Sequence, residues 1–239
     1  ECDQQRRDEQ LHKLLEIWSK WFPNDFQDAS TQHIFSPLIN IAGRTGDFQL
    51  EPESKIIELR RPEIPFNKKE ELPFISSPLI IAEHFTYVEI QLLRSIPASE
   101  FVGCSWTTSE KWTKAPRIMK FTEHFNHIVT YIIFTIIQAK ADQRLRVIER
   151  WIQIMDAAAE VINYQLVFEI YSALCSPAVS NDDIWNNLST DTKNLYKKYS
   201  LLTAPSARFA NYRKHLQQHP PQTVVPYIGP FLTSLVYIS

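Results

Sequence analysis

Two histidines, His124 and His127, are the first candidates for chemistry in this chain, because residues three positions apart lie on one face of a helix. Such a pair can hold a metal ion when acidic or cysteine ligands complete the set. No Asp, Glu or Cys stands at a matching spacing from them in the sequence. The pattern therefore does not predict a metal site.

The sequence also lacks the motifs that accompany covalent catalysis in other proteins. The chain contains no glycine-rich phosphate loop, so we do not expect it to bind a nucleotide itself. No serine lies in a nucleophile-elbow pattern. The carboxylates of Glu149, Glu160 and Glu169 are interpreted as solvated positions on helices. The sequence thus argues against bond-making catalysis.

One helical stripe has the composition of a binding surface. In the helix expected at 161–175, Phe168, Ser172 and Cys175 fall at positions i, i+4 and i+7 and therefore share a face. The buried side of that helix can be formed by Leu166, Val167, Ile170, Tyr171 and Leu174. Two interpretations remain open from the spacing. Either Phe168 packs against a neighbouring helix, as is usual where a helix is apolar nearly all round, or the stripe binds a partner.

The elements that must position these residues are helices. Ser77 and Pro78 begin one, Pro116 begins the next, and Asp142 suits the N-cap of a third. The apolar stripe of the helix after Pro116 consists of Ile118, Phe121, Phe125, Ile128, Ile132 and Ile136. Further helices are expected at 161–175, 181–202 and 205–218. Because no segment has a convincing strand pattern, the predicted fold class is all-α.

Composition sets bounds on the class of protein. Hydrophobic residues make up 44% and charged residues 22%, which is typical of a globular domain. The net charge of −2 gives no argument for nucleic acid or a membrane surface as a partner. The cysteines Cys2, Cys104 and Cys175 share no metal-ligand spacing and are interpreted as reduced thiols. The longest apolar run, 128–137, is too short to span a bilayer.

Several short motifs follow one another along 76–239. They are AEHFT (82–86) with Glu89, Glu100-Phe101 with Trp106, Phe125-Asn126, Arg144 with Val147-Ile148, Asn163-Tyr164, Ser172-Ala173-Leu174, Trp185 with Leu188, Phe209 with Tyr212-Arg213, and PYIGPFLTSL from Pro226. In this order they resemble the catalytic domain of Ras-type guanine-nucleotide exchange factors, the son-of-sevenless class. Residues 1–47 resemble the end of the helical exchanger motif that precedes this domain in the family, and 48–75 is expected to be a linker.

The chain departs from the family's pattern at three positions. Phe85 replaces the usual Leu, which is a tolerable apolar exchange. Ile162 stands where the first Asn of an N-N-aromatic motif is usual, and Cys175 stands where a polar amide is usual. The last two departures put activity or the choice of substrate in question.

The resemblance implies a bowl of helices that binds a Ras-like small GTPase and opens its nucleotide site, so that GDP leaves and GTP enters without a covalent step. The positions that match the family's GTPase-contacting residues are Phe121, Thr122, Phe125, Phe168, Ser172, Cys175 and Tyr227. A helical hairpin would displace part of the GTPase's nucleotide site. Val236 matches its apolar wedge residue, and the acidic partner would lie beyond Ser239. On this expectation, 76–239 is a catalytic domain truncated in its hairpin.

The same resemblance leaves an alternative, a non-catalytic helical scaffold that binds a small GTPase without exchange. In either case we expect no cofactor, no metal and no nucleic acid. The preferred partner would be a GDP-bound or nucleotide-free Ras-family GTPase. The protein would be cytoplasmic and would be recruited to membranes by regions or partners outside this chain.

Overall fold

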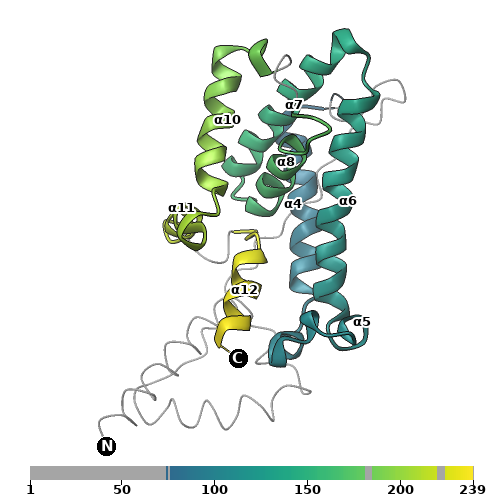
Figure 1. Cartoon of the computed structure of the whole chain (residues 1–239), viewed down its shortest axis with the longest axis vertical. Coiled ribbons are helices and arrows are strands. Elements are labelled where there is room, and N and C mark those ends of the chain that lie inside the picture. The colour runs from purple at the N-terminus through teal and green to yellow at the C-terminus, as the bar shows by residue number, and fades with distance from the viewer. Residues whose placement is uncertain (1–73, 75, 181–184, 220–223, 239) are drawn as a thin grey trace, which may run out of the picture.

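The computed structural model describes residues 74, 76–180, 185–219 and 224–238 (Figure 1). In this part of the chain the regular structure is helical, and the only β-type pairing is an isolated parallel bridge between Asn163 and Val225. The predicted all-α class is confirmed. The exchanger-motif remnant expected at 1–47, and all of the linker expected at 48–75 except Phe74, lie outside the described residues.

The described helices follow the expected order along the chain. They are α4 (Pro78–Arg94), the 3-10 segment η1 (Ala98–Thr107), α5 (Lys111–Lys114), α6 (Pro116–Gln138), α7 (Ala141–Glu160), α8 (Tyr164–Leu174), α10 (Thr190–Thr203), α11 (Ser206–Leu216) and α12 (Gly229–Ile238). The helices α4, α6, α7 and α8 pack together, and α10 lies along one side of them (Figure 1). The last helix, α12, contacts η1 near the lower end of the bundle in this view (Figure 1).

Local signals account for most helix starts. The Ser77 hydroxyl accepts a hydrogen bond from the amide of Ile80, and proline occupies the first turn of both α4 and α6, where its missing N–H is tolerated. Asp142 differs from the prediction. The N-cap of α7 is Lys140, and Asp142 lies within the first turn, where a carboxylate still interacts favourably with the helix dipole.

The start of α6 is held by a residue from another element. The Glu100 carboxylate is 6% exposed and accepts hydrogen bonds from the amides of Arg117 at 2.9 Å and Ile118 at 3.0 Å. These amides have no partner within the helix, because the first turn of an α-helix leaves its N–H groups unpaired. Glu100 therefore fixes the position of the end of α6 that carries the predicted contact residues.

The other end of α6 is held in a similar way. The Arg144 guanidinium, from the first turns of α7, donates to the carbonyl oxygens of Ile136 at 3.2 Å and Ile137 at 3.1 Å. A cation at a helix C-terminus satisfies free carbonyl groups and complements the helix dipole. Both ends of α6 are thus fastened by side chains belonging to motifs of the sequence.

The main core lies around α7 and α8. Every residue from 164 to 170 is buried, so α8 is covered nearly all round, and Trp151 of α7 is fully buried in the same cluster. A second, smaller cluster contains Phe121 with Ile96, Ala115 and Ile118. The predicted site residues are therefore carried by the elements that form the two cores.

Candidate functional site

Three of the predicted contact residues meet in a cluster of aromatic rings. The Tyr227 ring stacks on Phe168 with a centroid separation of 4.1 Å and an interplanar angle of 19°. Phe125 lies 5.5 Å from Tyr227, and Tyr212 and Phe209 contact Phe168 at 5.0 and 5.9 Å. We call these five residues the aromatic cluster. It joins α6, α8, α11 and the segment before α12.

Hydrogen bonds hold the backbone at Tyr227 and at Val225, two residues before it. Val225 accepts a hydrogen bond from the amide of Tyr164 at 2.8 Å and donates to the carbonyl of Ile162 at 3.0 Å. Two residues later, the amide of Tyr227 donates to the Tyr212 hydroxyl at 2.7 Å. Tyr227 is therefore placed by main-chain bonds as well as by the packing of its ring.

Gly229 allows the Tyr227 ring to lie where it does. A Cβ atom added at Gly229 would lie 2.6 Å from both Cζ and Oη of Tyr227, closer than non-bonded carbon atoms approach one another. The glycine of the PYIG motif is thus required by the close approach of this ring. The absence of a side chain at this position of the motif leaves room for the Tyr227 ring.

The predicted contact residues differ in their exposure. Thr122 and Cys175 are exposed, and Phe125, Ser172 and Tyr227 are half-buried. Phe121 is 1% exposed and Phe168 is 5% exposed. Phe168 lies beneath Tyr227, so a partner reaches it only if the covering rings move. The role of each residue in binding stays a prediction.

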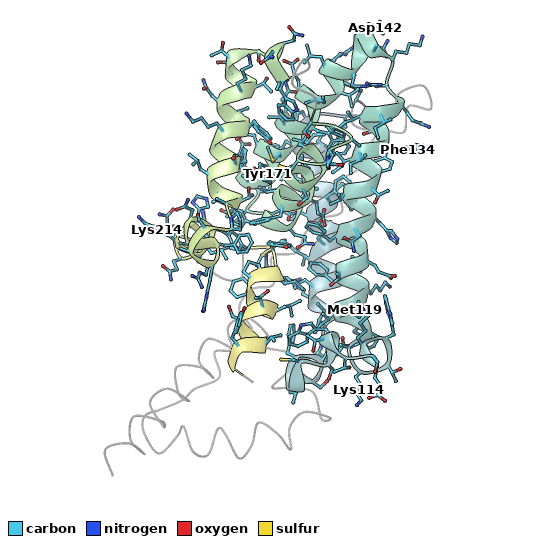
Figure 2. All side chains as sticks on the ribbon, viewed as in Figure 1. Lys114, Met119, Phe134, Asp142, Tyr171 and Lys214 are labelled. Atoms are coloured by element: carbon cyan, nitrogen blue, oxygen red, sulfur yellow. The ribbon has the colours of Figure 1, made fainter. Side chains whose placement is uncertain are left out.

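Cys175 belongs to a different group of rings. Its Sγ lies 3.5 Å from the Tyr196 hydroxyl, and the Tyr196 ring stacks on Tyr171 and contacts Trp185. Tyr171, labelled in Figure 2, also donates from its hydroxyl to Ser200 on α10. Burial, and the contact with Cys175, raise the pKa of Tyr196 above its ordinary value. Cys175 therefore lies on the side of α8 that faces α10.

Val236, the predicted wedge residue, lies on α12 and is 44% exposed. The start of this segment is anchored, because Ile228 and Leu232 pack against the second core cluster. Phe231 and Tyr237 are also exposed, at 41% and 74%. The helix thus presents apolar side chains to the surroundings of the described part of the chain.

A largely buried group of polar side chains comes together from α4, α6 and α8, and sequence reasoning missed it. We call it the polar cluster, and its members are Thr86, Glu89, His124, Asn163, Gln165 and Glu169. Asn163 donates from Nδ2 to Thr86 Oγ1 at 2.9 Å and to Glu89 Oε2 at 2.6 Å. Its Oδ1 accepts from the amide of Leu166 at 3.0 Å, so the same side chain caps α8. Glu89 Oε1 lies 3.5 Å from His124 Nε2.

The prediction made for Glu169, a member of the polar cluster, was wrong. It is fully buried, whereas the sequence was interpreted as placing it in solvent. Burial raises the pKa of its carboxyl well above the ordinary value, and the neighbouring Glu89 raises it further by charge repulsion and hydrogen bonding. The residues next to Glu169 in the sequence could have indicated that it is buried. Glu169 stands between Phe168 and Ile170 in a helix that is apolar nearly all round.

The polar cluster contains the donor atoms of a possible cation site. One ligand atom each from Glu89, His124 and Glu169 lies within 4.8 Å of the other two, and carboxylate and imidazole groups suit divalent cations. The acidic groups come from α4 and α8, so no spacing within the sequence around His124 could reveal them. His127 is exposed and is not a member of this group.

Comparison with known proteins places this arrangement in a family. Residues 80–239 match the RasGEF domain. The chain belongs to the RasGEF family. It is 37% identical over 170 residues to Ras-specific guanine nucleotide-releasing factor 1 of Mus musculus. The aligned segment makes up 70% of this chain and 13% of that protein. The resemblance read from the motifs is thereby confirmed.

Two further relatives show the range of similarity. Ras-specific guanine nucleotide-releasing factor 2 of Rattus norvegicus is 34% identical over 166 residues, 68% of this chain and 14% of the relative. Ras guanine nucleotide exchange factor P of Dictyostelium discoideum is 27% identical over 165 residues, 68% of this chain and 11% of the relative. The RasGEF chain therefore spans only a small part of the curated relatives it matches.

Within the described residues, no helix combines the length and apolar character needed to cross a membrane.

The backbone at Ile162 has a conformation that is unusual for its side chain. Its φ of 59° lies in the left-handed region, which asparagine adopts more readily than a β-branched residue does. The side chain is half-buried and packs on the main core. The asparagine that is usual in the RasGEF motif would therefore suit the left-handed backbone conformation at this position before α8.

Proposed function

We propose that this RasGEF domain binds a Ras-family small GTPase, opens its nucleotide site and promotes release of GDP and loading of GTP. The observation that carries the proposal is the match of residues 80–239 to the RasGEF domain. The relatives named as Ras-specific guanine nucleotide-releasing factors support Ras-family proteins as the partner.

The proposed binding face is formed by the exposed and half-buried residues around the aromatic cluster. Thr122 and Phe125 approach it from α6 and Ser172 from α8, and the Tyr227 ring contacts both Phe125 and Phe168. Cys175, just after α8, lies at the edge of this face beside Tyr196. Phe121 and Phe168 support it from below. A half-buried tyrosine is a good anchor, because it offers a large apolar ring and a polar tip.

The proposed chemistry is a change in binding free energy. An exchange factor acts by binding the nucleotide-free GTPase more tightly than the nucleotide-bound form. A ten-thousandfold acceleration of release requires about 5.5 kcal/mol of such differential binding. We propose that Val236 on α12 contributes by displacing part of the nucleotide site. We further propose that the domain acts in the cytoplasm and reaches membranes through regions or partners outside this chain.

The test is release of a fluorescent GDP analogue from a panel of Ras-, Rap- and Ral-like GTPases. We would compare the chain with a chimera that carries, after Ser239, the segment that follows the matched region in the mouse relative. Acceleration by the chimera on at least one GTPase is the expected result. A stable complex with nucleotide-free GTPase but no acceleration would identify a non-catalytic scaffold. No acceleration and no complex with any GTPase would contradict the proposal.

A further inference from the structure

Three side chains of the polar cluster that are able to bind a metal ion come together from three different helices. Glu89 belongs to α4, His124 to α6 and Glu169 to α8. One ligand atom of each lies within 4.8 Å of the other two, and Glu89 Oε1 lies 3.5 Å from His124 Nε2. Metal–ligand bonds of about 2.0–2.2 Å place neighbouring donor atoms roughly 3–4 Å apart around one ion. A small adjustment of the side chains therefore brings all three into one coordination shell.

Each of these side chains also has a buried atom that no hydrogen bond satisfies. Glu89 and Glu169 are fully buried. Glu89 Oε1, His124 Nε2 and Glu169 Oε2 have no hydrogen-bond partner among the described residues. An unpaired polar atom in a protein interior costs free energy, so each one calls for an explanation such as an ion or a water molecule. One cation in contact with all three residues would satisfy these atoms together.

Neighbouring amide groups hold the two carboxylates in a suitable orientation. Asn163 Nδ2 donates to Glu89 Oε2 at 2.6 Å, and Gln165 Nε2 donates to Glu169 Oε1 at 3.1 Å. Asn163 is held in turn by Thr86, whose hydroxyl accepts a hydrogen bond from Nδ2 at 2.9 Å. Hydrogen bonds of this kind orient the ligands of metal sites and raise their affinity for the metal. Each carboxylate thus has one oxygen bonded to the protein and one oxygen available to an ion.

The charge of the three ligands matches that of a divalent cation. As metal ligands the carboxylates are ionised and the imidazole is neutral, so together they carry two negative charges. Burying such charges without compensation is costly. None of the lysines and arginines in the described ranges is buried, and the buried residues of α7, which packs against α4 and α8, are all apolar. A single divalent ion would neutralise the site.

We propose that Glu89, His124 and Glu169 bind one divalent cation, zinc or a neighbouring transition metal, which links α4, α6 and α8 inside the domain. An imidazole nitrogen favours these metals over magnesium and calcium, which prefer oxygen ligands. The His124 side chain is 18% exposed, so the ion enters the site past this residue. The spacing around His124 predicted no metal, because the two carboxylates come from distant parts of the chain. This site is independent of the proposed exchange function.

The first test is calorimetric titration of the whole chain with zinc chloride, after treatment with a chelator and dialysis. One equivalent of zinc should bind to the wild type. Glu169→Gln and His124→Gln each remove a ligand while keeping a side chain of similar size, and they should weaken this binding at least about tenfold. Absence of a stoichiometric zinc site, or equal affinity in His124→Gln and the wild type, would overturn the proposal.

The matched control for this titration is His127→Gln. His127 is an exposed histidine of the same helix, three positions after His124, and it is not one of the three ligands. His127→Gln should therefore bind zinc as tightly as the wild type does. Weaker binding by this variant would identify a site on the surface of α6 and would also overturn the proposal.

The second test is chemical unfolding of the same variants with and without zinc. A cation that binds only the folded chain lowers the unfolding constant by mass action, about a hundredfold when its concentration is one hundred times the dissociation constant. The wild type and His127→Gln should show this effect, and Glu169→Gln should not. Because Glu169→Gln removes a buried charge, this variant should fold without the ion. Equal stabilisation of the wild type and Glu169→Gln by zinc would contradict a role for the buried carboxylate.

The third test identifies the ligands with cobalt(II), whose visible absorption depends on the atoms that coordinate it. The cobalt-loaded wild type should show bands that zinc abolishes and that an excess of magnesium or calcium leaves unchanged. The same bands should be present in His127→Gln and lost in His124→Gln. Bands that persist in His124→Gln, or that calcium abolishes, would overturn the assignment. None of these measurements uses a GTPase, so they decide the proposal whether or not the domain promotes exchange.

Discussion

The hydroxyl of Tyr212 is bonded to both main-chain polar groups of Tyr227. It accepts from the amide of Tyr227 at 2.7 Å and donates to its carbonyl oxygen at 3.3 Å. Tyr212 is fully buried, and its ring also packs edge-on against Phe168. One side chain of α11 therefore holds the backbone of Tyr227 and supports the ring on which Tyr227 stacks.

Removing that hydroxyl should loosen the segment that carries Tyr227. Tyr212→Phe keeps the ring but leaves a partly buried amide and carbonyl without their partner, which costs about 1–3 kcal/mol. We expect a decrease of that size in the free energy of unfolding, measured in denaturant. Tyr237→Phe is the control, because that tyrosine is 74% exposed and its loss of a hydroxyl should leave stability unchanged. An equal decrease in both variants would show that the bonds to Tyr227 are not the cause.

Adding one methyl group at Gly229 should displace the Tyr227 ring. The new Cβ would lie 2.6 Å from Cζ and Oη of that ring, so the stacking on Phe168 cannot persist unchanged. We expect Gly229→Ala to change the near-ultraviolet circular dichroism of the aromatic residues and to weaken GTPase binding.

Gly103 offers a matched comparison for this substitution. It has a φ of 66°, and nothing lies within 4 Å of its Cβ position. Gly103→Ala should therefore destabilise the chain by about 1 kcal/mol through backbone strain alone. It should leave the aromatic spectrum and GTPase binding intact. A spectral change of the same kind in both variants would contradict the steric role of Gly229.

Replacing Ile162 by the family's asparagine should relieve backbone strain. Asparagine occupies the left-handed region more readily than a β-branched residue, which offsets the loss of half-buried apolar surface. Val161, the adjacent half-buried residue, has an ordinary φ of −85°. We expect Ile162→Asn to be at least about 1 kcal/mol more stable than Val161→Asn in chemical unfolding. Equal destabilisation by both substitutions would mean that the φ of Ile162 carries no appreciable strain.

Tyr227 and Phe168 should respond differently to truncation. Tyr227→Ala should weaken GTPase binding by more than about 1 kcal/mol, as for an interface anchor. Phe168→Ala should weaken binding too, but it also opens a cavity in the core and should cost about 3–5 kcal/mol of stability. Binding is measured by titration of nucleotide-free GTPase, and stability is measured separately. Unchanged affinity in both folded variants would show that the aromatic cluster does not contribute to the interface.

The parts of the fold that depend on neighbours in the sequence could be predicted. Ser77 and the prolines at 78 and 116 begin helices by local capping and fixed backbone angles. The stripe of α6 follows from its spacing, and Phe121, Ile132 and Ile136 are buried as expected. These features need no knowledge of the rest of the chain.

The parts that depend on distant partners could not be predicted. Glu100 caps a helix that begins sixteen positions later, and Glu89 meets Glu169 only because α4 and α8 pack together. The motif residues were recognised, but their pattern does not say which atoms they bond. The prediction for Asp142 failed although its residue type suits an N-cap, because α7 already begins at Ala141 and Asp142 lies in its first turn.

The exposed thiol of Cys175 has a practical consequence. Cys104 is buried, so within the described part of the chain a maleimide reagent should react at Cys175. With Cys2 replaced, a fluorescent or spin label attached there would lie at the edge of the proposed GTPase-binding face, next to the Tyr196 hydroxyl. One of the positions where this chain departs from its family is thus also an intrinsic attachment point for a reporter, from which the approach of a partner can be followed in real time.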